Sequence, residues 1–388
     1  MISNKPVILQ VLPALGTGGV ERGTIDMAQA IMRAGGIAIV ASADGIWKNS
    51  LERMGAIYIN LPLNSKKPWV IWKNQYALEK IIRSYHVDVV HVRSRGPAWS
   101  AWLAVKKCKT SFITTWHGVY SETWLGKRYY NKVMTKGERV IAISHYIAKR
   151  LHDHYGVEKE RLRVIHRGVD VTAFDPEMPL GERVSELAKK WQIPEDKKII
   201  LLPGRLTPWK GQELLIRAFV TLKERYPNWV CVFVGPAKAK DQFSKRLLIL
   251  ANQLKVRDRL YFVGDCQDMP AALTLANIVV VPSLKPEPFG RVVIEAQAME
   301  RPVVVANHGG AAETVIEGQS GYLFEPGNIQ SFAEILEFLM QRSEPDLHWI
   351  GRLSREAVQQ YYTLDQMQRA TLKVYNEVLP DAKQFVIE

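Results

Sequence analysis

Short runs of β-branched and other apolar residues alternate with helix-like segments along the chain, and this alternation constrains its fold most strongly. The runs form two series, at residues 6–12, 37–41, 87–92, 112–116, 139–143 and 163–166, and at residues 198–202, 229–234, 259–263, 278–282 and 302–306. Alternating strands and helices are typical of parallel sheets covered by helices. The runs at 199–202 and 278–282 are almost wholly apolar, as in strands buried on both faces. We therefore predict an α/β protein with two parallel, doubly wound sheets.

The break between the two series divides the chain into two domains, which suits a length of 388 residues. Prolines at 176, 179 and 194 punctuate this stretch, and we predict a linker at residues 168–179. The sequence GERVSELAKKW that follows is predicted to be a helix. We expect the domains to span residues 1–172 and 173–361, with an amphipathic helix in the C-terminal segment 362–388.

Positive charge is concentrated in the first half of the chain. The chain carries 52 Lys+Arg and 39 Asp+Glu, a net charge of +13. Residues 1–180 hold 26 Lys+Arg against 14 Asp+Glu, whereas the remainder holds 26 against 25. A basic half indicates an anionic partner, for which an anionic membrane surface, a phosphorylated substrate and nucleic acid are the candidates.

The three cysteines, Cys108, Cys231 and Cys266, are scattered and have no Cys-x-x-Cys spacing. They fit a reducing compartment better than a disulfide framework or a zinc site. The N-terminus enters a strand-like run without a charged-then-apolar leader, and no apolar stretch approaches the ~18 residues of a membrane span. We expect a cytoplasmic protein whose membrane contact, if any, is peripheral.

A glycine-rich loop, LGTGGVERG at residues 15–23, follows the first predicted strand. Glycines at a strand-to-helix turn let the backbone approach a ligand closely, and a helix N-terminus favours anions. The spacing of Gly16, Gly18 and Gly19 is not the dinucleotide fingerprint, because Glu21 stands where its last glycine would be. The loop is therefore either a ligand loop or a plain tight turn.

The loop PGRLTPWKG at residues 203–211 places Arg205 and Lys210 after another predicted strand. Two cations at the carboxyl end of a strand, beside a helix N-terminus, suit a pyrophosphate. The alternative is a solvated loop with two surface cations.

The segment 282–315 brings two carboxylates to a junction between a loop and a helix. Glu287 lies at the mouth of the predicted helix and Glu295 one to two turns inside it, so both can face one ligand. A carboxylate accepts hydrogen bonds from neighbouring sugar hydroxyls, although Glu287 also suits the helix dipole without any ligand. The backbone amides of Phe289, Gly290 and Arg291 are candidates for contact with a phosphate.

These motifs together resemble a known family. The Glu-x7-Glu pattern in PEPFGRVVIEAQAM, preceded by GRLTPWKG and followed by HGGAAETV, is similar to the retaining glycosyltransferases of family 4. GTGGVER, TTWHGVY, RVIHRGVD and the closing helix fall in the family's order, so the resemblance spans the chain. It implies the GT-B fold, in which two Rossmann-like domains face each other across a donor-binding cleft.

The resemblance also implies a role for each domain. Residues 1–172 would bind the acceptor, with the segment 362–388 packing back on them, and residues 173–361 would bind the sugar nucleotide. Arg205 and Lys210 would bind the donor diphosphate, Glu287 the hydroxyls of the transferred sugar and Glu295 the nucleotide ribose. Gly18 and Gly19 would face the donor phosphates and the acceptor.

His117, in WHGVY, matches the family's histidine near the reacting sugar, although a buried structural histidine is the alternative. The expected catalytic residues are therefore His117, Arg205, Lys210 and Glu287. No Asp-x-Asp sequence occurs, so we expect no metal and no cofactor beyond the nucleotide-sugar donor. The resemblance implies retention of anomeric configuration.

The acceptor is indicated only by the basic first half. Aromatic and basic residues are interleaved at 66–73, 99–109 and 116–132, which suits a protein that rests on an anionic bilayer. Alternatively, Trp99 and Trp102 are core residues on one helix, and the lysines between the aromatic residues form a solvated face. No signature of a nucleic-acid-binding motif is present. We expect a lipid-linked acceptor at the inner face of the cytoplasmic membrane.

Residues 91–102 and 362–379 look most like bacterial enzymes that build the lipopolysaccharide core, some of which use GDP-mannose. Arg93 and Arg95 are then candidates for acceptor contacts, and UDP- and ADP-sugars remain alternative donors. A sugar-nucleotide 2-epimerase of the same fold and a glycogen-synthase-like glucosyltransferase are competing predictions. A two-lobed sugar-binding protein would not need the pair Arg205 and Lys210.

Overall fold

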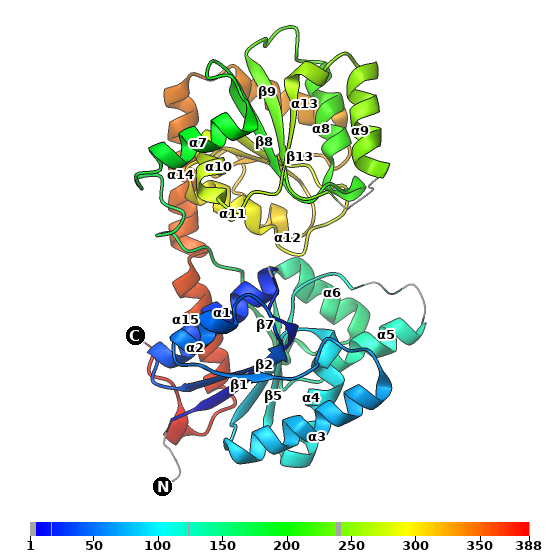
Figure 1. Ribbon diagram of the computed structural model, residues 1–388, viewed down its shortest axis with the longest axis vertical. Helices are drawn as coiled ribbons and strands as arrows, with labels where there is room; N and C mark the ends of the chain where they lie inside the picture. The colour runs from blue at the N-terminus through cyan, green and yellow to red at the C-terminus, as the bar shows by residue number, and fades with distance from the viewer. Residues whose placement is uncertain (1–4, 17, 121, 123–124, 238–241, 388) are drawn as a thin grey trace. The chain divides into compact units, whose positions relative to one another are not determined.

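The computed structural model describes residues 5–16, 18–120, 122, 125–237 and 242–387. The chain forms two compact units, the first made of Met1–His166 with Leu364–Glu388 and the second of Arg167–Thr363. The boundaries expected from the sequence, at residues 172 and 361, lie a few residues from these. The segment that closes the chain is part of the first unit, where helix α15 (Leu364–Asn376) packs against α1 (Gly19–Arg33) (Figure 1).

A parallel sheet forms the centre of the first unit. Within the described residues its seven strands run in the order β3-β2-β1-β4-β5-β6-β7. They are β1 (Val7–Ala14), β2 (Ile37–Ala43), β3 (Ile57–Asn60), β4 (Val89–Val92), β5 (Ser111–Trp116), β6 (Arg139–Ala142) and β7 (Leu162–Val164). The order reverses between β1 and β4, which creates a switch point at their carboxyl ends.

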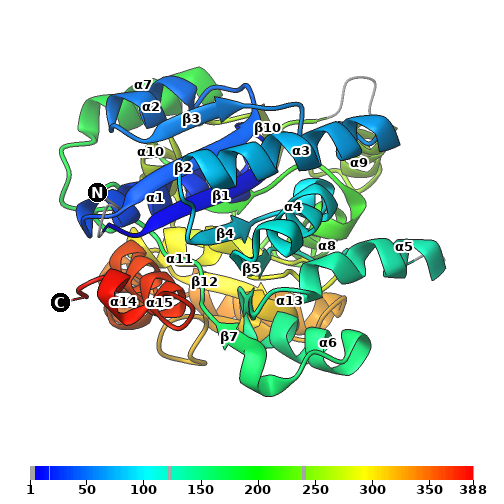
Figure 2. The ribbon, with the colours of Figure 1, turned by 90° about the horizontal axis from the view of Figure 1, so that it is seen from below.

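The helices of the first unit lie on both sides of this sheet. Helices α1, α2 (Lys48–Arg53) and α15 share one apolar core with β1, including Ile8, Ile31 and Tyr375, all of which are fully buried. Helix α4 (Arg95–Cys108) packs on β1 and β4, and α3 (Pro68–Ser84) packs on α4 (Figure 2). The remaining helices are α5 (Leu125–Asn131) and α6 (His145–Tyr155).

The second unit is also built on a parallel sheet. Its six described strands run in the order β10-β9-β8-β11-β12-β13. They are β8 (Lys198–Pro203), β9 (Trp229–Val234), β10 (Leu260–Gly264), β11 (Ile278–Val281), β12 (Val303–Ala306) and β13 (Tyr322–Phe324). Here the switch point lies between β8 and β11.

Side chains of β8 alternate between two apolar cores, as expected for a strand that is covered on both faces. Ile200 and Leu202 lie in one core and Ile199 and Leu201 in the other. The first core includes α8 (Gln212–Val220), α9 (Gln242–Gln253) and α13 (Ile329–Met340). The second includes α7 (Gly181–Trp191), α10 (Met269–Leu275) and α11 (Arg291–Ala298) (Figure 1). The unit also contains α12 (Gly309–Ala312) and α14 (Glu344–Tyr361).

The α/β class with two parallel sheets is confirmed. Strands β3 and β13 were not predicted; both are short strands at sheet edges. The segment 168–179, where we predicted the linker, lies within the second unit and is bonded to it. Arg355 donates to the carbonyl oxygen of Phe174 at 2.9 Å and to the carboxylate of Asp175 at 3.0 Å. Within the described residues, no helix has both the length and the apolar character that a membrane span requires.

Candidate active site

The two loops that the sequence singled out in the second unit follow the neighbouring strands β8 and β11. One contains Arg205 and Lys210, and the other contains Glu287. Both strands run in the same direction, so both loops leave the sheet at its carboxyl edge. Strand order reverses between these two strands, which is where open α/β sheets bind ligands.

Gly211 brings the two loops into direct contact. Its φ is +78°, and a Cβ atom there would lie 1.9 Å from the carbonyl oxygen of Pro282. The amide of Leu284 donates to the carbonyl oxygen of Trp209 at 2.7 Å. A side chain at position 211 would force the loops apart, so the close approach requires glycine.

Lys210 and Glu287 form an ion pair across this contact. Lys210 Nζ lies 2.7 Å from Glu287 Oε1, and the two side chains are only 14% and 9% exposed. Ser283 Oγ donates to the same oxygen at 2.5 Å. The ammonium of Lys210 also lies 4.6 Å from the centre of the Trp209 ring. The lysine and carboxylate predicted to bind different parts of one donor are therefore adjacent.

Arg205 lies on the first loop with an exposed side chain. Its carbonyl oxygen accepts from Gln212 Nε2 at 3.0 Å, which fixes the loop to the start of α8. Across the described part of the chain, no carboxylate is paired with its guanidinium. The Arg205 side chain is thus available to an anion.

Helix α11 begins directly after the second loop. Gly290 precedes it with φ +83°, and a Cβ atom there would lie 2.6 Å from Cβ of Ala311. The first-turn amides of a helix have no partner within the helix, so this end attracts anions. Phe289 is buried, which limits any contact of this residue with a donor to its backbone.

Glu295 is buried within α11 and 8% exposed. Its Oε1 accepts from Arg291 one turn earlier at 2.7 Å. The structure thus gives the Arg291 side chain a partner that the sequence analysis did not foresee. The predicted contact of Glu295 with a ribose stays a prediction.

Three further residues support the Glu287 loop, and none of them was selected from the sequence as a site residue. Ser283 holds the carboxylate, and His308 Nε2 lies 2.7 Å from the carbonyl oxygen of Ser283. The amide of Gly310 donates to the carbonyl oxygen of Glu287 at 2.7 Å. The sequence did hold a sign of these contacts, because His308 and Gly310 are the first and third residues of the motif HGGAAETV.

The candidates in the first unit lie at the carboxyl ends of its strands. Gly18 precedes α1, and a Cβ atom there would meet the Glu21 carboxylate, the closest contact being 2.4 Å. His117 follows β5 directly and is half-buried. Arg95 donates to Asn131 Oδ1 at 2.8 Å, and its guanidinium lies 4.7 Å from the Tyr120 ring centre. Gly19 is the first residue of α1.

Arg93, the other candidate for an acceptor contact, is buried. It is 2% exposed, and its Nε donates to Gln10 Oε1 at 2.8 Å. Burial lowers the pKa of its guanidinium, which the neighbouring Tyr375 partly offsets. A side chain buried in this way supports the sheet, and the structure gives no support to its predicted contact with an acceptor.

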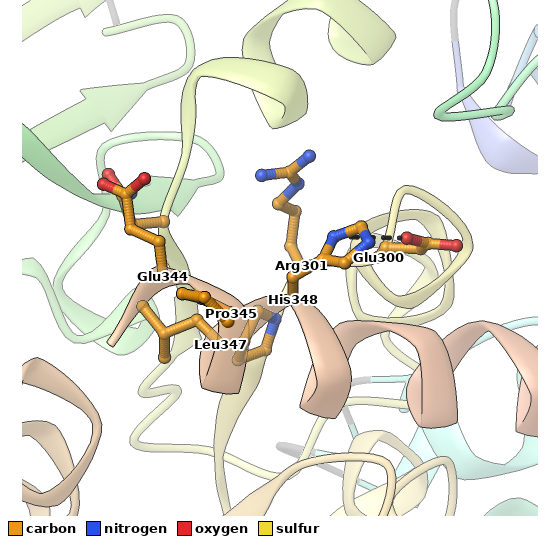
Figure 3. Close-up of a pocket in the computed structure, with 8 residues that line it drawn as sticks. Glu300, Arg301, Glu344, Pro345, Leu347 and His348 are labelled. Carbon is orange, nitrogen blue, oxygen red and sulfur yellow. Dashed lines mark ion pairs between the residues drawn. The ribbon is translucent and has the colours of Figure 1, made fainter. Parts of the chain in front are cut away.

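A separate hollow of about 540 Å³ lies elsewhere in the second unit (Figure 3). Asn277 and Pro302, which line it, precede β11 and β12, so the hollow lies at the amino edge of the sheet. His348 and Glu300 face one another there at 3.5 Å. This hollow is not part of the candidate site. Within the described ranges, no group of three or more His, Cys, Asp or Glu residues is arranged to hold a metal ion.

Comparison with known proteins identifies the family. The family model "Glycosyl transferases group 1" matches residues 184–354, and "Glycosyltransferase Family 4" matches residues 17–173. The crystal structure of a glycosyltransferase from Rickettsia africae ESF-5 is 36% identical, with a TM-score of 0.89, and the match covers 98% of this chain and 100% of that one. The chain belongs to the glycosyltransferases. Its two Rossmann-like domains are those of the GT-B fold, as the sequence indicated.

This glycosyltransferase is also similar to more distant proteins. A D-inositol 3-phosphate glycosyltransferase of Salinispora tropica is 29% identical over 327 residues, which are 78% of this chain and 66% of that protein. The structure of Anabaena HepE in complex with UDP-glucose has a TM-score of 0.80 at 23% identity, covering 95% of this chain and 99% of that one. At 23% sequence identity, this similarity shows a common fold only.

Proposed function

We propose that this glycosyltransferase uses a nucleotide-diphosphate sugar that binds at the Lys210–Glu287 pair. The observation that carries the proposal is this ion pair at the switch point of the sheet. Both hydrogen bonds that Glu287 accepts from described side chains end on Oε1, which leaves Oε2 for sugar hydroxyls. Lys210 has three N–H donors and gives one of them to Glu287, so it can also bind a phosphate oxygen.

The donor diphosphate is proposed to lie between Lys210, Arg205 and the N-terminus of α11. The exposed Arg205 side chain and the helix end both favour negative charge. Phe289, Gly290 and Arg291 would contribute their backbone amides. Glu295 would bind the ribose, and Arg291 would orient it through the bond that the two side chains already make.

The reaction we propose retains anomeric configuration. The bond between the anomeric carbon and the phosphate oxygen breaks through an oxocarbenium-like transition state, and the acceptor hydroxyl oxygen forms the new bond on the same face. The acceptor proton passes to the departing phosphate. Negative charge grows on that phosphate, so its stabilisation by Arg205 and Lys210 is the main catalytic contribution, and we expect no metal requirement.

Two parts of the first unit complete the proposal. Gly18 and Gly19 would let the backbone approach the donor phosphates and the acceptor, and His117 would lie near the reacting sugar. Arg95 remains a candidate for an acceptor contact, because the residue is only half-buried. These roles are inferred from the sequence resemblance.

The acceptor is proposed to be lipid-linked, with the lipopolysaccharide core as the specific candidate and GDP-mannose as a candidate donor. The excess of 26 Lys+Arg over 14 Asp+Glu in residues 1–180 supports an anionic surface as partner. The enzyme would then lie on the inner face of the cytoplasmic membrane. The relative named for D-inositol 3-phosphate supports a soluble phosphorylated acceptor as an alternative.

Product analysis separates transfer from epimerisation. The protein would be incubated with labelled UDP-, GDP- and ADP-sugars and a bacterial lipid extract, with and without a chelator. We expect label in the lipid fraction in both conditions and an α-linked product from an α-linked donor. An epimerised nucleotide sugar without transfer would favour the epimerase, and label in no product would overturn the proposed function.

A further inference from the structure

Helix α3 exposes a stripe of aromatic and basic side chains in the first unit. Trp69, Trp72 and Tyr76 are 59%, 58% and 45% exposed, and their spacing of three and four residues places them on one side of the helix. Exposed basic residues extend the stripe. We define the α3 face as Trp69, Trp72, Lys73, Tyr76, Lys80 and Arg83.

The opposite side of α3 is a normal apolar packing surface. Leu78, Ile81 and Ile82 are buried, and the helix packs against α4 (Figure 2). A surface helix normally carries its apolar residues on the packed side only. The rings on the α3 face are therefore additional apolar area that the fold of this unit does not bury.

Lysines lie against these rings. Lys67 Nζ is 5.4 Å from the centre of the Trp69 ring, and Lys107 Nζ of α4 is 4.7 Å from that of Tyr76. The rings of Trp72 and Tyr76 are 4.6 Å apart. Both ammonium groups thus lie over rings, as in cation–π contacts, and that of Lys107 also pairs with Glu79.

The aromatic and basic character continues onto α4. Trp102 is half-buried, and Lys106 Nζ lies 5.0 Å from its ring centre. Trp99 contacts both Trp102 and Tyr129 of α5, each at 5.7 Å between ring centres. Trp99 and Trp102 are therefore neither fully core nor fully exposed. Trp124 lies outside the described residues.

The charge around the α3 face is one-sided. Residues 61–86 contain five Lys+Arg and one acidic residue, Glu79. Glu79 is paired with Lys107 at 3.0 Å, and its carboxylate also accepts from Gln75 at 2.8 Å. The surface thus presents cations without a competing free carboxylate among these residues.

We propose that the α3 face rests on an anionic lipid bilayer, with the rings at the level of the headgroups and the cations on lipid phosphates. Trp, Tyr and basic residues on one side of a helix are the pattern of helices that lie in the plane of a membrane interface. The 17 residues of α3 span about 25 Å, enough to contact several headgroups. This inference rests on the membrane association proposed above and assigns it to one surface.

Vesicle flotation of the full-length protein tests the assignment, with phosphatidylcholine vesicles with or without phosphatidylglycerol, at physiological and at high ionic strength. The wild type should bind only the anionic vesicles and dissociate at high salt. The variant Lys73→Glu/Lys80→Glu should bind at least about 25-fold more weakly, since each lysine near such a surface contributes about fivefold to the affinity. Trp69→Ala/Trp72→Ala/Tyr76→Ala should bind at least about tenfold more weakly.

Matched substitutions in the second unit serve as controls. Trp349→Ala removes a ring that is 54% exposed, and Lys189→Glu/Lys245→Glu reverses two exposed charges. Both should bind as the wild type does, and every variant should keep its unfolding temperature, because the substituted side chains are exposed.

Three outcomes contradict the inference in distinguishable ways. A wild type that binds no anionic vesicles overturns the proposed membrane association as well. Equal binding by the wild type and both α3 variants overturns only the assignment to the α3 face. Tighter binding of the α3 face to an oligonucleotide than to vesicles would make nucleic acid its partner instead.

Discussion

The carboxylate of Glu287 is held by two donors at once. Lys210 and Ser283 both contact Oε1, at 2.7 and 2.5 Å, in a region where the side chains of Lys210 and Glu287 are at most 14% exposed. Hydrogen bonds to a charged group in such surroundings are among the stronger ones in proteins. The geometry of the carboxylate is therefore set before a donor arrives, which preorganises the site.

Ser283 acts in this account as a positioning residue for Glu287. Ser283→Ala should lower kcat/KM by about tenfold, because one bond to the carboxylate is lost and its orientation loosens. Ser283→Thr keeps the hydroxyl and should recover most of the activity. Steady-state kinetics of both variants check this, with unfolding temperatures as the control for folding. Equal losses in the two variants would contradict a role for the hydroxyl.

At the scale of elements, Gly211 joins the two loops of the candidate site, and Gly264, at the end of β10 and outside the site, has a similar backbone conformation. Gly211 adopts φ +78° in close contact with Pro282, whereas Gly264 adopts φ +76° with no atom within 4 Å of its added Cβ. The two positions share the backbone strain and differ in the space around them. They form a matched pair for the close approach of the loops.

Gly211→Ala should destabilise the protein more than Gly264→Ala. The left-handed conformation costs each variant about 1 kcal/mol, and only position 211 also has the backbone of residue 282 in the way. Gly211→Ala should also lose most of its sugar-nucleotide binding. Urea denaturation and ligand titration of both variants measure this. Equal destabilisation would show that the contact between the loops is not tight.

Helix α15 is tied to the sheet of the first unit by a buried histidine. His91 Nδ1 lies 2.7 Å from the Tyr375 hydroxyl, and Nε2 lies 2.6 Å from Thr115 Oγ1. Burial lowers the pKa of His91 well below its usual value, and the charge of Arg93 adds to the effect. The folded protein thus keeps this imidazole neutral.

This arrangement predicts an acid-sensitive first unit. Unfolded His91 binds a proton near pH 6.5 and folded His91 does not, so the contribution of His91 to stability is complete above about pH 6.5. This contribution to stability falls by up to about 1.4 kcal/mol per pH unit as the pH decreases from about 6.5 towards the pKa of His91 in the folded protein. His91→Gln should flatten this slope in urea denaturation, since all other histidines are unchanged. The same slope in both proteins would refute the assignment.

The sequence predicted all the central strands and two of the four edge strands, β7 and β10, and missed the edge strands β3 and β13. Strand β8 follows from an apolar run that is buried along most of its length, whereas β3 (Ile57–Asn60) and β13 (Tyr322–Phe324) are short and mostly half-buried, so their sequence signal is weak. Motif order selected Arg205, Lys210 and Glu287, which the fold brings to one edge. The contacts of Ser283 and His308 depend on the path of the loops. The hydrogen bond of Arg93 joins it to Gln10, 83 residues earlier in the chain. None of these contacts was predictable from local sequence.

At the scale of the whole molecule, the chain passes from the first unit to the second and returns. It crosses at residues 166–167 and again at 363–364. The returning segment places six buried residues in the core of the first unit: Met367, Leu372, Val374, Tyr375, Leu379 and Phe385. The stability of the N-terminal half of the sequence therefore depends on the C-terminus.

Truncation after Thr363 should unfold the first unit and spare the second. Six buried core residues are removed, and each contributes about 1.5–3 kcal/mol to stability. Their sum is as large as the whole free energy of unfolding of a typical domain. Hydrogen exchange should show lost protection in β1 and β2 and retained protection in β8 and β9. Truncation after Phe385, which spares that core, is the control and should change neither. Loss of protection in both units would mean that they do not fold separately.

The central claim is that Arg205, Lys210 and Glu287 form a site for a nucleotide-diphosphate sugar. Calorimetric titration with UDP-, GDP- and ADP-sugars tests it most directly, using the wild type, Arg205→Ala, Glu287→Ala and the control Lys189→Ala. We predict that the wild type and Lys189→Ala bind one of these donors equally, and that Arg205→Ala and Glu287→Ala each bind it at least about tenfold more weakly, because each loses a charge-assisted contact. Donor binding that is as tight in Arg205→Ala and Glu287→Ala as in the wild type would contradict the claim.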